Sequence, residues 1–128
     1  MKKLLDTHIF LWFIAGDRRL STIARTAVES TSDSRLFSVA GLWEIAIKVS
    51  LGRLELPSPH GAFLHRMLDD TGISLLPILP EHVELVASLP FHHRDPFDRL
   101  LVAQAVHEGL LLVSQDPQVR LYDVEVIG

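Results

Sequence analysis

Short apolar runs alternate with helical segments along this chain, and the alternation constrains the fold more than any other feature. Runs rich in Leu, Val and Ile and bounded by polar or turn residues predict buried strands at 3–5, 36–39, 73–76, 110–114 and 124–127. Helical spacing and end signals predict helices at 8–15, from 21, 42–51, from 58 to Gly72, 80–89 and from 95 to Gly109. Such alternation predicts an α/β class, doubly wound, with a mainly parallel sheet covered on both faces.

The composition favours one domain spanning residues 1–128, because a chain of 128 residues buries a substantial core without covalent staples. The sequence has no cysteine, which excludes disulfides, thiolate zinc sites and cysteine nucleophiles and suits a reducing cytoplasm. Asp6 and His8 interrupt the apolar residues after Lys2 and Lys3, so we expect no secretory signal. No apolar run approaches the ~20 residues of a spanning helix, so we expect a cytoplasmic protein without membrane contact.

The charge and the apolar content point to different kinds of partner. A net charge of −4 argues against a broad basic surface for nucleic acid, although the position of the charges matters more than their sum. At 48% hydrophobic, with Trp12, Phe13 and Trp43 in a small core, the chain is expected to expose apolar surface to a partner chain. A dense core is the alternative explanation.

The segment RDPFDRLLVAQA, residues 94–105, places two aspartates around a proline at the start of a helix. Asp95 is an N-cap candidate, and Asp98 suits the positive end of the helix dipole. The positions Gln104, His107 and Glu108 are expected to form the outer, polar face. Asp98 then faces apolar neighbours, where a carboxylate needs a cation, a metal or several donors.

Further acids are expected at the carboxyl edge of the sheet, where ligands gather in doubly wound folds. Asp6 follows the first strand, Asp116 follows the fourth, and Glu44 lies in the helix after the second. Taken singly, the aspartates are explained by helix capping, and Glu44 by an ion pair with Lys48 four residues later. Taken together with Asp98, acids from distant segments at one edge are hard to explain by capping.

Electrostatics favours a metal at such a cluster. Two carboxylates about 4 Å apart repel by roughly 4 kcal/mol at an effective dielectric of about 20. A divalent cation removes this cost, and ligation by oxygen alone selects Mg²⁺ or Mn²⁺ over zinc. The sequence therefore predicts a site suited to phosphodiester cleavage by water.

With these residues in hand, the chain resembles the PIN-domain nucleases, in particular the VapC-type toxins of bacterial toxin–antitoxin pairs. The resemblance rests on four ordered segments that span the chain: LLDTHIFLWF, SVAGLWEIAIKVSLGRL, HRDPFDRLLVAQA and LLLVSQD. It implies a PIN-like three-layer α/β/α fold with about five strands, and an endoribonuclease that uses one or two Mg²⁺ or Mn²⁺ ions. It also implies an RNA substrate, a cognate antitoxin and a homodimer. By position, the catalytic and metal-binding acids of the family fall on Asp6, Glu44, Asp98 and Asp116.

Supporting roles are assigned around these acids. Thr7 and Ser114 are expected to orient ligands or waters through their hydroxyls, and Asp95 to cap the helix or lie in the outer shell. The candidates for contacts with RNA phosphates are Lys48, Arg53, Arg94 and Arg99, each with an ordinary surface charge as the alternative.

Other functions compete with this hypothesis. A phospho-receiver domain needs paired acids after the first strand and a late lysine, whereas Asp6 stands alone and the lysines are at 2, 3 and 48. A metal-free ribonuclease is suggested by the adjacent His92 and His93, for which a solvated pair is the alternative. A non-catalytic PIN-like protein that binds nucleic acid or a partner is the remaining alternative.

Overall fold

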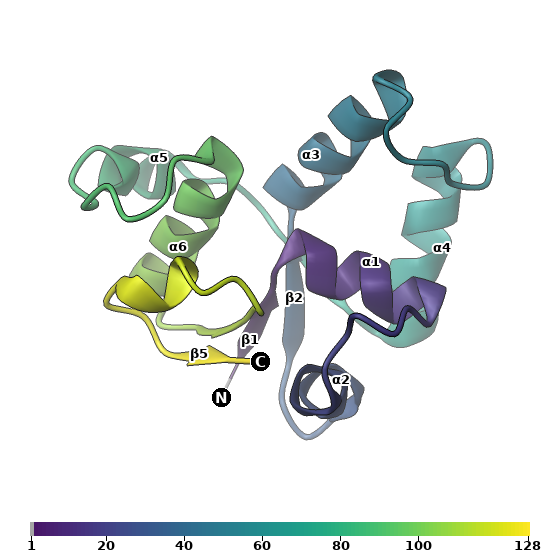
Figure 1. Cartoon of the computed structure of the whole chain (residues 1–128), viewed down its shortest axis with the longest axis horizontal. Helices are drawn as coiled ribbons and strands as arrows, with labels where there is room; N and C mark the ends of the chain where they lie inside the picture. Colours follow the sequence, from purple (N-terminus) through teal and green to yellow (C-terminus); the bar gives the residue numbers. More distant parts are fainter. Residues whose placement is uncertain (1) are drawn as a thin grey trace.

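The sheet has five parallel strands in the order β3-β2-β1-β4-β5, as the computed structural model shows for residues 2–128 (Figure 1). The strands are β1 (Lys3–Leu5), β2 (Arg35–Ser38), β3 (Ser74–Leu76), β4 (Leu111–Val113) and β5 (Val126–Ile127). The helices are α1 (Thr7–Ala15), α2 (Thr22–Glu29), α3 (Val39–Ser50), α4 (His60–Thr71), α5 (Pro80–Val86), α6 (Pro96–Glu108) and the short 3₁₀ helix η1 (Val119–Leu121). The predicted α/β class and the parallel, five-stranded sheet are confirmed.

The register brings the ends of the central strands to the same level. Leu5 in β1 pairs with Phe37 in β2 and with Val113 in β4. Since all three strands run in one direction, the residues that follow them meet at one edge of the sheet. Asp6 and Ser114 occupy this edge.

Alternating side chains of the strands build a core on each face of the sheet. Leu5, Phe37 and Val113 pack in one cluster with residues from α1, α2, α3 and α4. Leu4 and Leu112 pack in the other with α6 and η1. Figure 1 shows the same division, with α5 and α6 on the opposite side from α1 and α4. The fold is thus the predicted three-layer arrangement.

Several predicted boundaries shift by one to three residues, and side-chain hydrogen bonds explain two of these shifts. The Ser38 hydroxyl accepts from the backbone N–H of Ala40 at 3.0 Å, so β2 ends at Ser38 and α3 begins at Val39 instead of at 42. Helix α5 ends at Val86 instead of at 89, where the Arg99 guanidinium donates to the carbonyls of Val86 and Leu89. Arg99 fixes this loop from the side.

The prediction of a solvent-facing Gln104 is wrong. Gln104 is fully buried, and its side-chain amide donates to the carbonyl of Pro77 at 3.3 Å. Helix α5 packs against α6 and covers the face that the sequence pattern assigns to solvent (Figure 1). Among the described residues, no helix is long and apolar enough to cross a membrane.

Candidate metal centre

Asp6 is held rigidly at the end of β1. It is the N-cap of α1, where its Oδ1 accepts from the backbone N–H of His8 at 3.1 Å. Its Oδ2 accepts from the Ser114 hydroxyl at 2.7 Å. The residue is only 4% exposed. Each carboxylate oxygen has one donor and retains a lone pair for a further contact.

Ser114 connects two of the predicted acids. Its hydroxyl donates to Asp6 and accepts from the backbone N–H of Asp116 at 3.1 Å. Ser114 is fully buried, and Thr7 is buried beside Asp6 at the start of α1. The Asp116 Oδ1 accepts from the backbone N–H of Gln118 at 2.9 Å, which orients this carboxylate as well.

Glu44 reaches the same edge from α3. It is buried, and its Oε2 lies 3.2 Å from the Lys48 Nζ, as the spacing of four residues on a helix allows. The ion pair considered from the sequence is therefore present. It coexists with the placement of Glu44 near the other acids, because Glu44 contributes to raising the pKa values of both Asp6 and Asp98.

Asp98 lies in the first turn of α6. Asp95 is the N-cap of this helix, and its Oδ1 accepts from the backbone N–H groups of Phe97 and Asp98 at 2.8 and 3.4 Å. Burial, followed by the negative charges of Asp6 and Asp95, raises the pKa of Asp98 to about 7. The carboxyl group is thus poorly compensated by the protein itself.

Burial also raises the pKa of Asp6, although Ser114 and the His8 backbone oppose this effect. The raised pKa values of these two acids show that, chiefly through burial, the protein leaves both carboxylates poorly solvated. Asp98 and Asp116, together with His93, offer ligand atoms that all lie within 4.8 Å of one another, and carboxylate oxygens are the ligands that hard divalent cations prefer. These acidic groups could hold a metal.

His93 lies against this cluster, which sequence reasoning missed. Its Nε2 is 2.7 Å from the Asp116 Oδ2 and 3.2 Å from the Asp98 Oδ2. The expectation of a solvated histidine pair is wrong for His93, whose side chain is only 12% exposed, whereas His92 is exposed. The available signal was position, since His93 stands two residues before the N-cap Asp95.

Three of the four residues predicted to contact RNA phosphates are accessible, and the fourth is buried. Lys48 pairs with Glu44 near the acids, while Arg53 and Arg94 are exposed. The prediction that Arg99 contacts RNA phosphates is wrong. Arg99 is only 5% exposed, and it donates to the carbonyls of Val86, Leu89 and Pro90 and to the Tyr122 hydroxyl. Its guanidinium is occupied inside the protein and is not presented to RNA.

A family comparison agrees with this arrangement. The sequence model of the family described as PIN domain matches residues 3–125 of this chain. The chain belongs to the PIN-domain family. The matched stretch contains every acid described above.

Individual relatives match this PIN domain over most of its length. Ribonuclease VapC22 from Mycobacterium tuberculosis is 29% identical over 118 residues, which cover 91% of this chain and 88% of that protein. The structure of VapBC2 from Rickettsia felis, bound to a DNA fragment from their promoter, matches with a TM-score of 0.73 at 13% identity and covers 98% of this chain and 97% of that one. FitAcB from Neisseria gonorrhoeae matches with a TM-score of 0.61 at 18% identity and covers 97% and 95%. These structures show the same fold.

One hollow adjoins the acids of the PIN domain, and a second hollow adjoins the first. The first, of about 260 Å³, is lined by Asp6, Asp116, His8 and Trp12. The other, of about 480 Å³, shares His8 and Trp12 and adds Lys48 and Arg53 among its lining residues. The lining of the larger hollow thus includes the cations Arg19, Lys48 and Arg53 together with the acids Asp17 and Glu55.

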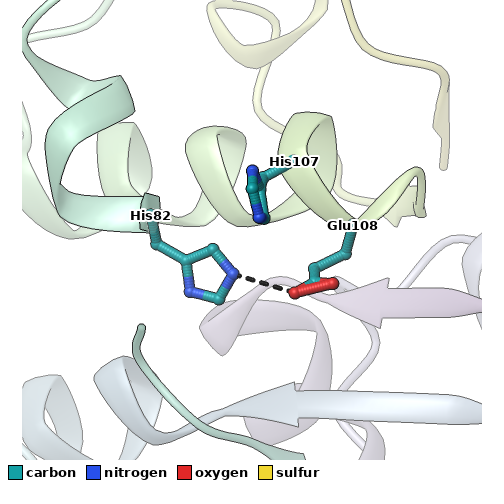
Figure 2. Close-up of side chains that lie close together, drawn as sticks. All are labelled: His82, His107 and Glu108. Atoms are coloured by element: carbon teal, nitrogen blue, oxygen red, sulfur yellow. Dashed lines mark hydrogen bonds and ion pairs between the residues drawn. The ribbon is translucent and has the colours of Figure 1, made fainter. Parts of the chain in front are cut away.

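A second group of potential ligands lies between α5 and α6, where His82 faces Glu108 with His107 alongside (Figure 2). The His82 Nδ1 accepts from the backbone N–H of Leu79 at 3.0 Å, so the neutral ring carries its hydrogen on Nε2. That Nε2 lies 3.1 Å from the Glu108 Oε1 and donates to it (Figure 2). The ring nitrogens of His82 thus have no free lone pair for a metal. The hydrogen bond between His82 and Glu108 links α5 to α6 instead.

Proposed function

We propose that this PIN domain is a divalent-metal-dependent endoribonuclease and acts as the toxin of a toxin–antitoxin pair. The observation that carries the proposal is the convergence of Asp6, Glu44 and Asp98 at the carboxyl edge of the sheet, where burial and then neighbouring carboxylate charges raise the pKa values of Asp6 and Asp98. The name of the relative VapC22 supports a ribonuclease activity.

The four acids would hold Mg²⁺ or Mn²⁺, with Ser114 and the helix caps fixing their orientation. When bound, such a cation supplies a more acidic water for in-line attack on phosphorus and charge stabilisation for the departing oxygen. Asp6 and Asp116 are the most constrained of the acids, because both oxygens of each already accept a hydrogen bond. Asp98 has the raised pKa that a cation would lower by favouring its ionised form.

RNA would approach over the larger hollow. Lys48 and Arg53 line it, and Arg94 is exposed one residue before Asp95. These cations would contact phosphates locally, in a chain whose net charge is −4. A metal in the acidic site would offset part of that net charge.

An antitoxin and a second copy of the chain would cover apolar surface. Trp43 and Phe91 are both exposed, and Trp43 makes an edge-on contact with Phe97 at 5.0 Å between ring centroids. Large exposed aromatic side chains are characteristic of partner surfaces. The names of the structural neighbours VapBC2 and FitAcB support an assembly of this kind.

The test is cleavage of RNA by the purified protein in millimolar Mn²⁺, with and without EDTA. Asp98→Asn should reduce cleavage by at least about 1,000-fold, because ligands that act as a unit fail together. Asp70→Asn, an exposed aspartate on α4, is the matched control and should cleave normally. Mapping of RNA ends after brief induction in cells would identify the target and the chemistry of the ends.

Cleavage that persists in EDTA, or in Asp98→Asn, would contradict the proposal. RNA binding without cleavage in Mn²⁺ would favour the non-catalytic alternative. Labelling of Asp6 by acetyl phosphate would favour the phospho-receiver alternative.

A further inference from the structure

His93 is the one histidine among the described residues whose ring contacts two of the predicted metal-binding acids. Its Nε2 lies 2.7 Å from Asp116 and 3.2 Å from Asp98, in a largely buried position. A cation or a hydrogen-bond donor at this place influences the orientation and the separation of the Asp98 and Asp116 carboxylates.

The hydrogen bond on the other side of the ring decides what His93 can do. The backbone N–H of Asp95 donates to the His93 Nδ1 at 3.1 Å, so Nδ1 presents its lone pair. The neutral imidazole then carries its hydrogen on Nε2 and donates it to Asp116. In this form Nε2 has no lone pair with which to bind a metal or to accept a proton from water.

The opposite arrangement is usual for a histidine that binds metal, because its second nitrogen donates to a carboxylate or carbonyl. Here the second nitrogen meets a donor. His93 is therefore unsuited to be a ligand through Nε2, for the same reason as His82 in the helix pair α5–α6.

We propose that His93 is a positioning residue of the acidic site, whose Nε2–H orients Asp116 and separates it from Asp98 without adding a formal charge. The inference rests on the proposed function, since it assumes that these acids hold a divalent cation. With Nε2–H on Oδ2 and the Gln118 N–H on Oδ1, the plane of the Asp116 carboxylate is fixed from both sides. Each oxygen keeps a lone pair for a cation.

The position of His93 is itself secured from the loop. Its backbone N–H donates to the Tyr122 hydroxyl at 2.9 Å, and that hydroxyl accepts from the Arg99 guanidinium at 3.2 Å. Arg99 also donates to the carbonyl of Pro90 at 2.9 Å. The buried Arg99 thus acts on the site indirectly, through Tyr122 and the loop that carries His93.

The test compares the Mn²⁺ affinity of His93→Ala and His93→Gln by isothermal titration calorimetry, a readout that does not require cleavage. Loss of an orienting partner typically weakens metal binding by about 10- to 100-fold, which is the change expected for His93→Ala. Glutamine offers an amide donor near the former Nε2 and should keep the affinity within about threefold of the wild type. His92→Ala, the exposed neighbour, is the control and should bind as the wild type does.

Tyr122→Phe provides an independent variant, because it removes only the hydroxyl that receives the His93 and Arg99 hydrogen bonds. It should weaken Mn²⁺ binding less than His93→Ala does and in the same direction. Thermal melts in EDTA establish that each variant is folded before its affinity is measured. If His93→Ala does not fold, the glutamine and phenylalanine variants still give the comparison.

Wild-type affinity in His93→Ala would overturn the inference, and so would a His93→Gln affinity as low as that of His93→Ala. RNA cleavage that survives EDTA but is lost in His93→Ala would also overturn it, since His93 would then act on the reaction directly. A wild-type protein that binds Mn²⁺ but cuts no RNA would contradict the proposed function alone. The variants would still decide the role of His93.

Discussion

Buried charges occur at both ends of the sheet, and the two ends treat them differently. At the amino ends of β1 and β2, Lys3 donates to the carbonyl of Ala27 at 3.1 Å, and Arg35 donates to those of Val28 and Thr71 at 2.8 and 2.6 Å. At the carboxyl ends, Asp6 and Asp98 lie among like charges and have raised pKa values. Lys3 and Arg35 are paired with carbonyl acceptors, whereas Asp6 and Asp98 keep raised pKa values even though Asp6 accepts two hydrogen bonds.

This difference separates residues that stabilise the structure from residues that prepare a site. Buried charged groups usually have partners, because desolvation without compensation is costly. At the carboxyl edge, Asp6 and Asp98 depart from that rule, because their pKa values are raised. The account therefore predicts that variants at the amino edge lose stability, and that a variant at the carboxyl edge gains stability while losing function.

The largest expected effect on stability is at the amino edge. Arg35→Met leaves the carbonyls of Val28 and Thr71 without their buried donors and should lower the free energy of unfolding by about 3 kcal/mol. Urea denaturation measures this loss. Cleavage per folded molecule should be unchanged, so an Arg35→Met protein that is stable but inactive would break the comparison.

The opposite sign is expected at the carboxyl edge. The pKa of Asp98 is about 7 in the folded protein against an ordinary 3.8, so its contribution to stability is present below about pH 4 and is lost as the pH rises through 7. Because asparagine does not ionise, the Asp98→Asn variant does not lose this stability as the pH rises. In EDTA, the variant should exceed the wild type in unfolding free energy by about 2 kcal/mol more at pH 8 than at pH 5.

Urea denaturation of both proteins at the two pH values measures this difference, and the comparison cancels the contributions of titrating groups that do not interact with Asp98. An Asp98→Asn variant that is less stable than the wild type at pH 8 would show that the carboxylate is well compensated. The contrast between the two edges would then be lost.

A smaller effect is expected from the metal itself. Mn²⁺ or Mg²⁺ at about ten times its dissociation constant should stabilise the wild type by about 1.4 kcal/mol, through preferential binding to the folded state. For a domain of this size the melting temperature should rise by several degrees. The melting temperature of Asp98→Asn should change little at the same metal concentration. That of Arg35→Met should rise as much as in the wild type, starting from a lower melting temperature without metal.

The sequence predicts the order of elements and the edge where the acids meet, because apolar period, caps and chain direction are local signals. It does not predict Gln104, Arg99 or His93 correctly, and all three errors have one cause. Helix α5 and the loop up to Asp95 fold over α6, so that Gln104 and Arg99 are buried and His93 is largely buried, although the sequence indicates a solvent-facing helix position, a surface charge and a solvated loop residue. Such coverage depends on tertiary packing, which spacing along one helix does not record.

The placement of Ser114 shows the same limit on a smaller scale. A serine after a strand predicts a hydroxyl near the edge of the sheet, but its bond to Asp6, 108 residues away in the sequence, depends on the pairing of β1 with β4. The raised pKa of Asp98 likewise results from burial together with charges on other segments.

The most direct test of the central claim is the anomalous signal of a crystal soaked in Mn²⁺. The account predicts a manganese peak coordinated by carboxylate oxygens of Asp6, Glu44, Asp98 or Asp116 at the carboxyl edge, with His93 donating to Asp116 and not bound to the ion. Carboxylates turned outward to solvent, with no manganese between them at saturating concentration, would contradict it.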